Sequence, residues 1–439
     1  MLGTMSRQGF RLDPSNDQAG GNLVQNKIMM TTAVWMASLG LLAASYDVTA
    51  LSVVLVHLKH AWHLSVGETA NLTAAPLVGS VLGSLLAGLY ADRYGRRLLL
   101  LMDFIAFVVA AGLAALATGY DSLLLWRTVM GVGIGADFAV VFPYLSESIP
   151  PANRGATMAF VLLINDVGQV LAYGLGSYLV NQGPSGFRWV LAVGAIMGIG
   201  VLMGRRSLPE SEKWQTEHLR SLPGIGRQII RLKALKTAGS SAGLWFLHQV
   251  TGQGLTLFLP VIISLLWSQT ASQSGTASIV VKLLSLGAGL LTVYLIDIWG
   301  RRPLQLLGFL GRGLALLPLG VAIVAGYHMP FWLAGIFLAV ALAFGALGPD
   351  KTTVITASER FATPIRGTGQ GESEMVGRLG GVFGVLLFGF FGHGAGLGDT
   401  ILVFSVIALL GALLTALTLP ETRPPSTKTS GSGAVALDP

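Results

Sequence analysis

Long apolar stretches separated by short polar segments recur along the 439-residue chain. Each is about 20 residues or longer, which at 1.5 Å rise per residue is enough for a helix to cross a bilayer. The stretches are continuously apolar rather than alternating, and this favours helices over barrel strands. About twelve spans are predicted, at residues 28–57, 70–92, 98–118, 122–145, 156–181, 187–204, 241–268, 277–298, 303–326, 330–357, 368–394 and 398–419. The pattern therefore predicts an all-α membrane protein.

Composition agrees with this prediction, because 52% of the residues are hydrophobic and only 11% are charged, against about 25% charged in a soluble domain. The 58 glycines would let membrane helices approach closely. Cysteine is absent, which excludes disulfides and thiol chemistry. The first 27 residues lack a compact signal peptide and read as a polar tail.

The net charge of +7 could suggest nucleic acid, but the basic residues gather in alternate loops, with runs at 93–97, 205–236 and 301–302. By the positive-inside rule these loops are cytoplasmic, so both termini are expected inside and the number of spans is even. The basic surplus therefore indicates topology, with the lipid bilayer rather than nucleic acid as its partner.

Three phrases occur twice in the same order. GLYADRYGRR at 88–97 is echoed by DIWGRR at 297–302, SESIPPANRG at 146–155 by SERFATPIRG at 358–367, and LPES at 208–211 by LPET at 419–422. The offsets are 205, 212 and 211 residues, and three phrases in the same order at such similar offsets are not expected by chance. The chain is predicted to contain two parallel six-helix repeats, an arrangement typical of transporters with a site near the midplane.

The domain boundaries that follow are a cytoplasmic N-terminal tail at 1–27, a first six-helix bundle at 28–204, a cytoplasmic linker at 205–240, a second bundle at 241–419 and a cytoplasmic C-terminal tail at 420–439.

The phrases GLYADRYGRR, PESEKW and PETRP resemble those of the major facilitator superfamily, in particular its sugar-porter, phosphate and organic-ion branches. The resemblance implies two bundles that rock around a central site, with charged loops that pair when the inner face closes. These implied latch residues are Gly88, Asp92, Arg93, Gly95, Arg96, Arg97, Glu147 and Arg154 in the first half, and Asp297, Gly300, Arg301, Arg302, Glu359 and Arg366 in the second. Glu147 is expected to pair with Arg96 or Arg154. The alternative is that these charges only orient the helices.

Ionisable groups inside the spans are candidate functional residues, because a charged side chain is costly in a bilayer. Asp47 and Arg127 match the acid and the arginine that proton symporters of the sugar-porter type use for coupling, and GIGADF around Asp137 resembles a phosphate-symporter phrase. A carboxylate beside a guanidinium stays ionised, and it takes up a proton when its partner leaves. We therefore predict proton coupling through Asp47, Arg127 and Asp137. A static buried ion pair is the alternative.

Polar side chains at helical spacing predict a wet cavity between the halves. Gln169 and Tyr173 lie on one face of span 5, with Asp166, and a stripe on span 7 carries Trp245, His248, Gln249 and Gln253. Single cases would be interhelical hydrogen bonds, and Trp245 could also face lipid or pack in the core.

Three basic groups, His248, Lys351 and Arg378, favour an anionic substrate, because an unpaired cation at the midplane needs an anionic partner. The neighbours Asp350 and Glu374 could instead neutralise Lys351 and Arg378 locally. Lys282 is interpreted as snorkelling or as marking a wrong span boundary.

The resulting hypothesis is a monomeric secondary transporter in the plasma (inner) membrane that couples protons to a small anion, phosphate or an organic acid. Proton-coupled sugar symport, facilitative uniport and a transporter-like nutrient sensor stay open. An enzyme is not expected, because metal, serine-nucleophile and phosphate-loop motifs are missing. No cofactor and no metal are expected.

Overall fold

The computed structural model describes residues 14–183, 185–218, 224–267, 271–327, 329–391 and 396–423. Within these ranges every regular element is a helix. The first half comprises α1 Pro14–Ala61, α2 Val66–Tyr94, α3 Arg96–Ala115, α4 Tyr120–Ser148, α5 Arg154–Leu179 and α6 Gly186–Arg205, with a 3-10 turn at Pro151–Asn153.

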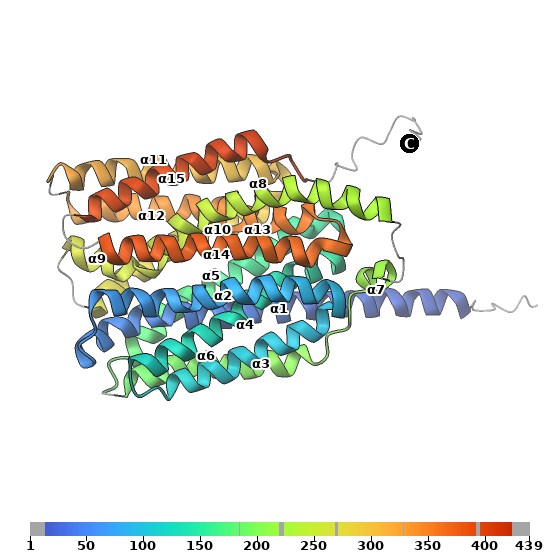
Figure 1. Cartoon of the computed structure of the whole chain (residues 1–439), viewed down its shortest axis with the longest axis horizontal. Coiled ribbons are helices and arrows are strands. Elements are labelled where there is room, and N and C mark those ends of the chain that lie inside the picture. The colour runs from blue at the N-terminus through green and yellow to red at the C-terminus, as the bar shows by residue number, and fades with distance from the viewer. Residues whose placement is uncertain are drawn as a thin grey trace, which may run out of the picture.

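The short α7 Glu212–His218 leads to the second half. That half comprises α8 Gly224–Leu257, α9 Leu259–Trp267, α10 Ala271–Trp299, α11 Arg301–Val324, α12 Phe331–Leu347, α13 Pro349–Arg360, α14 Arg366–Phe391 and α15 Gly396–Thr418, with a 3-10 turn at Thr363–Ile365. Figure 1 shows the two halves side by side, with helices running nearly parallel and α7 at one end. We call the end with α7 the latch end.

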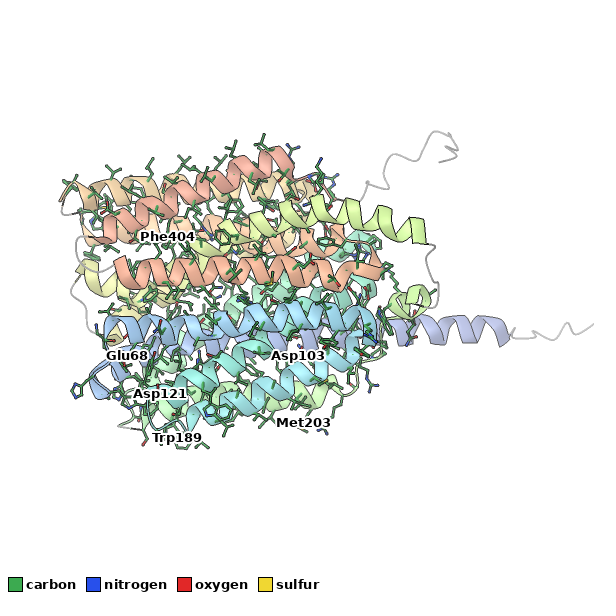
Figure 2. The ribbon with its side chains drawn as sticks, in the orientation of Figure 1. Glu68, Asp103, Asp121, Trp189, Met203 and Phe404 are labelled. Carbon is green, nitrogen blue, oxygen red and sulfur yellow. The ribbon has the colours of Figure 1, made fainter. Side chains whose placement is uncertain are left out.

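Ten helical segments of the described chain are long and apolar enough to cross a membrane. Helices α8 and α14 are comparable in length but fall outside this set, and they pack against each other within the bundle. The outward faces are apolar: Trp189 and Met203 on α6 are 62% and 66% exposed, and Figure 2 shows both at the edge of the bundle. Such exposed apolar side chains are what a bilayer-facing surface requires.

Two predicted spans are broken in the structure. Span 241–268 consists of α8 and α9 with a break at Phe258, and span 330–357 consists of α12 and α13 with a break at Gly348. Proline follows each break, at Pro260 and Pro349. Proline lacks the backbone N–H and clashes with the carbonyl four residues earlier, so an uninterrupted helix is disfavoured there.

The first helix also begins earlier than the predicted span, at Pro14 rather than residue 28. Extending an existing helix is easier than nucleating one, so part of the predicted polar tail continues α1.

Glycines set the closest helix contacts. A Cβ added to Gly79 would lie 1.9 Å from the carbonyl oxygen of Thr128, and one added to Gly131 would lie 2.1 Å from that of Pro76. Helices α2 and α4 therefore touch backbone to backbone. Helix α2 also packs against α14, and α5 packs against α10, and these two pairs form the largest helix contacts between the halves.

Candidate functional site: a charged cavity and two latches

A cavity of about 100 Å³ lies between the two halves. Its lining comes from α1, α4 and α5 of the first half and from α8, α10, α13 and α14 of the second. Eight predicted substrate residues are among the lining residues: Gln169, Trp245, His248, Gln249, Gln253, Asp350, Lys351 and Arg378. Tyr173 lies beside the cavity, and its hydroxyl donates a hydrogen bond across the halves to the carbonyl of Thr256 at 2.6 Å.

Most charged side chains in and around this cavity form ion pairs with one another. Lys351 of α13 pairs with Asp166 of α5 and so joins the halves directly. Asp350 does not pair with its neighbour Lys351. It accepts from Arg312 at 2.8 Å and lies 3.4 Å from His248.

Arg378 pairs with Glu374 one turn earlier on α14, which is the local neutralisation considered as an alternative. Its guanidinium also lies 4.7 Å from the ring centre of Phe138. Glu374 and Phe138 therefore hold the Arg378 side chain in place.

Lys282 is a further cation in the cavity lining. Its side chain is 4% exposed, and its ammonium donates to the hydroxyl of Thr256 at 3.4 Å. Snorkelling is therefore wrong for this residue, and so is a misplaced boundary, because Lys282 lies well inside α10. Among the described residues, no carboxylate lies within ion-pair distance of Lys282, and the other cations considered above each have one.

Asp47 and Arg127 form a buried pair outside the cavity lining. The Arg127 guanidinium donates to the Asp47 carboxylate at 2.9 Å and to the Asp47 carbonyl at 2.9 Å. The second Asp47 carboxylate oxygen is buried without a described hydrogen-bond partner. The pair links α1 to α4 within the first half.

Asp137 lies in a separate cluster. Its carboxylate is 2.7 Å from Arg205 of α6, and Asp103 of α3 is 3.4 Å from the same guanidinium. Arg205 also lies 4.1 Å from the ring centre of Phe104. The structure thus separates Asp137 from the Asp47–Arg127 pair with which it was grouped.

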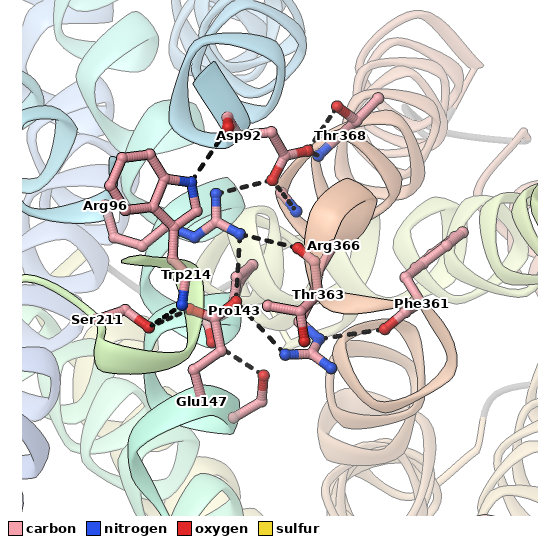
Figure 3. Close-up of polar contacts among 12 residues, drawn as sticks. Asp92, Arg96, Pro143, Glu147, Ser211, Trp214, Phe361, Thr363, Arg366 and Thr368 are labelled. Atoms are coloured by element: carbon pink, nitrogen blue, oxygen red, sulfur yellow. Dashed lines mark hydrogen bonds and ion pairs between the residues drawn. The ribbon is translucent and has the colours of Figure 1, made fainter. Parts of the chain in front are cut away.

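At the latch end, Asp92 joins α2 of the first half to the first turn of α14 (Figure 3). Its carboxylate accepts from the backbone N–H of Gly367 at 3.0 Å and from that of Thr368 at 2.7 Å. Gly88 permits this approach, because a Cβ there would lie 2.6 Å from the Gly367 carbonyl. A carboxylate is favoured at a helix N-terminus by the free N–H groups and the helix dipole.

Arg96 organises the rest of this first latch. It donates to Asp92 at 2.7 Å, to Glu147 at 3.1 Å and to the carbonyl of Thr363 in the other half at 3.3 Å. Arg366 of the second half is 3.4 Å from Glu147. Glu147 thus pairs with Arg96 and Arg366. Arg154 instead donates to the Ile149 carbonyl.

The second copy repeats the geometry. Asp297 of α10 accepts from the backbone N–H of Ala156 on α5 at 2.8 Å. Arg301 pairs with Asp297 at 2.9 Å and with Glu359 at 2.8 Å. Both copies therefore join a carboxylate of one half to a helix start in the other.

The half-ending phrases at 208–211 and 419–422 cap two helices that lie earlier in the chain, α3 and α11. Glu210 accepts from the N–H groups of Arg96 and Arg97, and Glu421 accepts from those of Arg301 and Arg302. Gly95 and Gly300, at φ 101° and 95°, provide the turns that bring these carboxylates in. Such positive φ values favour glycine.

The remaining latch residues have supporting positions. Arg97 donates to the Arg206 carbonyl and Arg302 to the Ala416 carbonyl, both near the end of another helix. Arg93 is exposed and lies against the Tyr94 ring.

Sequence reasoning missed Lys282 and Arg312 at the cavity, Asp103 and Arg205 around Asp137, and Glu210 and Glu421 at the latches. Lys282 had a detectable signal, because Ser278, Lys282, Ser285 and Thr292 form a polar stripe at helical spacing on an apolar segment. Arg312 had no comparable pattern around it. The two glutamates lie in a repeated phrase that indicated the repeat but not the helix that each one caps.

Two helical halves around a buried charged cavity, joined at one end by paired loops, define a membrane transporter. The chain belongs to the Major Facilitator Superfamily, whose family model matches residues 37–349 and 244–438. The superfamily resemblance and the all-α fold are confirmed, and the protein is a multi-pass membrane transporter rather than an enzyme.

The relatives are named for different substrates. A Bacillus subtilis (strain 168) protein described as a niacin/nicotinamide transporter, NiaP, is 29% identical over 375 residues, covering 83% of this chain and 89% of the relative. The glucose transporter GlcP of Staphylococcus epidermidis is 24% identical over 423 residues, covering 88% and 93%. The proton:xylose symporter XylE of E. coli has a similar solved structure, with a TM-score of 0.78, 21% identity and coverage of 91% and 97%.

Proposed function

We propose that the protein is a proton-coupled symporter that imports a small organic anion by alternating access. The charge of the cavity is the observation that supports an anionic substrate. Three basic side chains in and beside it, Lys351, Arg312 and Arg378, each have a carboxylate partner, and Lys282 has none among the described residues. A site with surplus positive charge in a low-dielectric interior favours an anion.

Alternating access is supported by the position of the two latches. Both join the halves at the same end of the molecule, so the cavity is separated from that end. Opening must break contacts between a carboxylate and a helix start twice, once in each copy. We infer that this end is cytoplasmic, with both termini on that side of the plasma (inner) membrane, because the basic loops lie there.

Proton coupling is assigned to Asp47 and Arg127. The pair is buried within the first half, so a change in the packing of α1 against α4 alters the distance between the charges. A buried carboxylate that loses its guanidinium becomes easier to protonate. Asp137 is proposed to assist through its cluster with Arg205 and Asp103.

A neutral sugar or polyol is the second candidate. Gln169, Gln249 and Gln253 line the cavity, and the Gln169 side-chain oxygen is buried without a described partner. Amides of this kind hydrogen-bond hydroxyl groups. Relatives with glucose and xylose in their names support this alternative, and NiaP supports a small ring acid or its amide.

The test is accumulation in proteoliposomes under an imposed proton gradient, outside acidic, with labelled nicotinate, benzoate, lactate, phosphate, glucose and xylose. The proposal expects at least one organic anion to accumulate beyond its level in protein-free liposomes, and a protonophore to abolish this added accumulation. Accumulation of a sugar alone would replace the anion with the second candidate. Equilibration that ignores the proton gradient would indicate uniport.

A further inference from the structure

Helix α10 presents two chemically different faces. Ser278, Lys282, Ser285 and Thr292 are at most 4% exposed. Large apolar residues of the same helix point outward, with Val280 at 66%, Leu283 at 51% and Tyr294 at 71% exposed. The spacing of the buried set follows one helix face. Lys282 therefore projects into the cavity from a helix whose other face is suited to lipid.

In the described part of the chain, the carboxylates nearest the ammonium of Lys282 are already paired with other cations. Asp166 is bound by Lys351, and Asp350 is bound by Arg312. The Thr256 hydroxyl at 3.4 Å offers a neutral contact that leaves the charge uncompensated. A buried cation in this position is costly until an anion joins it.

We propose that Lys282, with the hydroxyl of Thr256 beside it, is the subsite for the single carboxylate of a small organic monoanion. This inference rests on the proposed function and deepens it by naming the anchor and the charge of the substrate. One surplus cation matches one negative charge. A second charge on the substrate would have to displace Asp166, Asp350 or Glu374 from its existing partner.

The absence of native cysteine permits a charge-restoring experiment. In Lys282→Cys, the new thiol is unique, and alkylation with 2-bromoethylamine rebuilds a side chain of nearly lysine length that ends in an ammonium. Iodoacetamide adds a neutral group at the same position. Val280→Cys, on the outward face two residues away, is the matched control.

The measurement is binding of nicotinate, benzoate and lactate to the purified full-length protein, each compared with its neutral carboxamide. Wild type is expected to bind at least one carboxylate ten-fold or more tightly than its amide. Lys282→Cys is expected to lose this preference, 2-bromoethylamine to restore it and iodoacetamide not to restore it. Val280→Cys is expected to keep it after either reagent.

Three results would overturn the subsite: no carboxylate bound by wild type, equal binding of acid and amide by wild type, or an unchanged preference in Lys282→Cys before alkylation. If wild type accumulates an organic anion in the liposome assay and Lys282→Cys keeps the preference, the subsite fails while the proposed function stands. If wild type accumulates only sugars, the proposed function fails first.

Discussion

At the scale of single residues, the pair of Asp166 and Lys351 is distinctive because it joins the two halves beside the cavity. Removing one member of a buried ion pair leaves an uncompensated charge, which costs about 3–5 kcal/mol, whereas removing both is much less harmful. We expect Asp166→Asn and Lys351→Met each to lower the thermal midpoint in detergent clearly, and the double variant to recover most of the loss. Equal loss in all three variants would contradict a paired role.

Asp47 gives the second prediction at this scale. Asparagine keeps the size and polarity of the side chain but cannot carry a proton. Asp47→Asn is therefore expected to reduce accumulation against a gradient at least ten-fold and to leave exchange of labelled for unlabelled substrate largely intact. Arg127→Lys serves as the companion variant, because it keeps the charge but loses the two-pronged contact with the Asp47 carboxylate and carbonyl. Full accumulation by Asp47→Asn would exclude the assigned role.

Much of the cavity lining was predictable from single residues, since polar groups on apolar helices stand out. The ion-pair partners of the charged side chains could not be predicted in this way. Asp350 and Lys351 are neighbours in sequence, yet each binds a partner from a different helix, Arg312 and Asp166. Adjacent positions on a helix point about 100° apart, so sequence adjacency does not give contact.

At the scale of helices, the contact between α2 and α4 depends on glycine. A Cβ at Gly79 would overlap the Thr128 carbonyl, whereas a Cβ at Gly112 on α3 would have no described atom within 4 Å. Overpacking of this kind typically costs about 1–3 kcal/mol. We expect Gly79→Ala to lower the thermal midpoint and the transport rate, with Gly112→Ala as the control. Similar behaviour of the two variants would argue against a backbone contact.

The helix boundaries show what the hydrophobic pattern can and cannot predict. The apolar runs predicted that the spans exist, but the breaks at Phe258 and Gly348 lie inside two of those runs. Hydrophobicity does not change at a proline, whereas hydrogen bonding does. The prolines at 260 and 349 were an incomplete signal, because Pro76, Pro143 and Pro318 lie inside unbroken helices.

At the scale of the whole molecule, the repeated phrases predicted two related halves, and in the structure each half places one latch aspartate, Asp92 or Asp297, at a helix start of the other. Which helices meet across the halves, α2 with α14 and α5 with α10, depends on contacts far apart in sequence and was not visible in the phrases.

The latches give a prediction about the balance between conformations. Asp92→Asn with Asp297→Asn weakens both contacts to helix starts, so the latch end should open more often. Spin labels on Tyr94→Cys and Trp299→Cys, exposed positions at the ends of α2 and α10, report the separation. We expect a longer distance in the double variant and no change in Asp121→Asn, an exposed acid at the start of α4. An unchanged distance in the double variant would mean that the charges only orient the helices.

The most direct test of the account is the internal pH of proteoliposomes, recorded with a trapped dye, when an organic anion is added outside under a proton gradient. The account predicts that anion entry is accompanied by internal acidification beyond that of empty liposomes, and that Asp47→Asn abolishes the added signal. Entry of the anion without acidification would contradict proton symport.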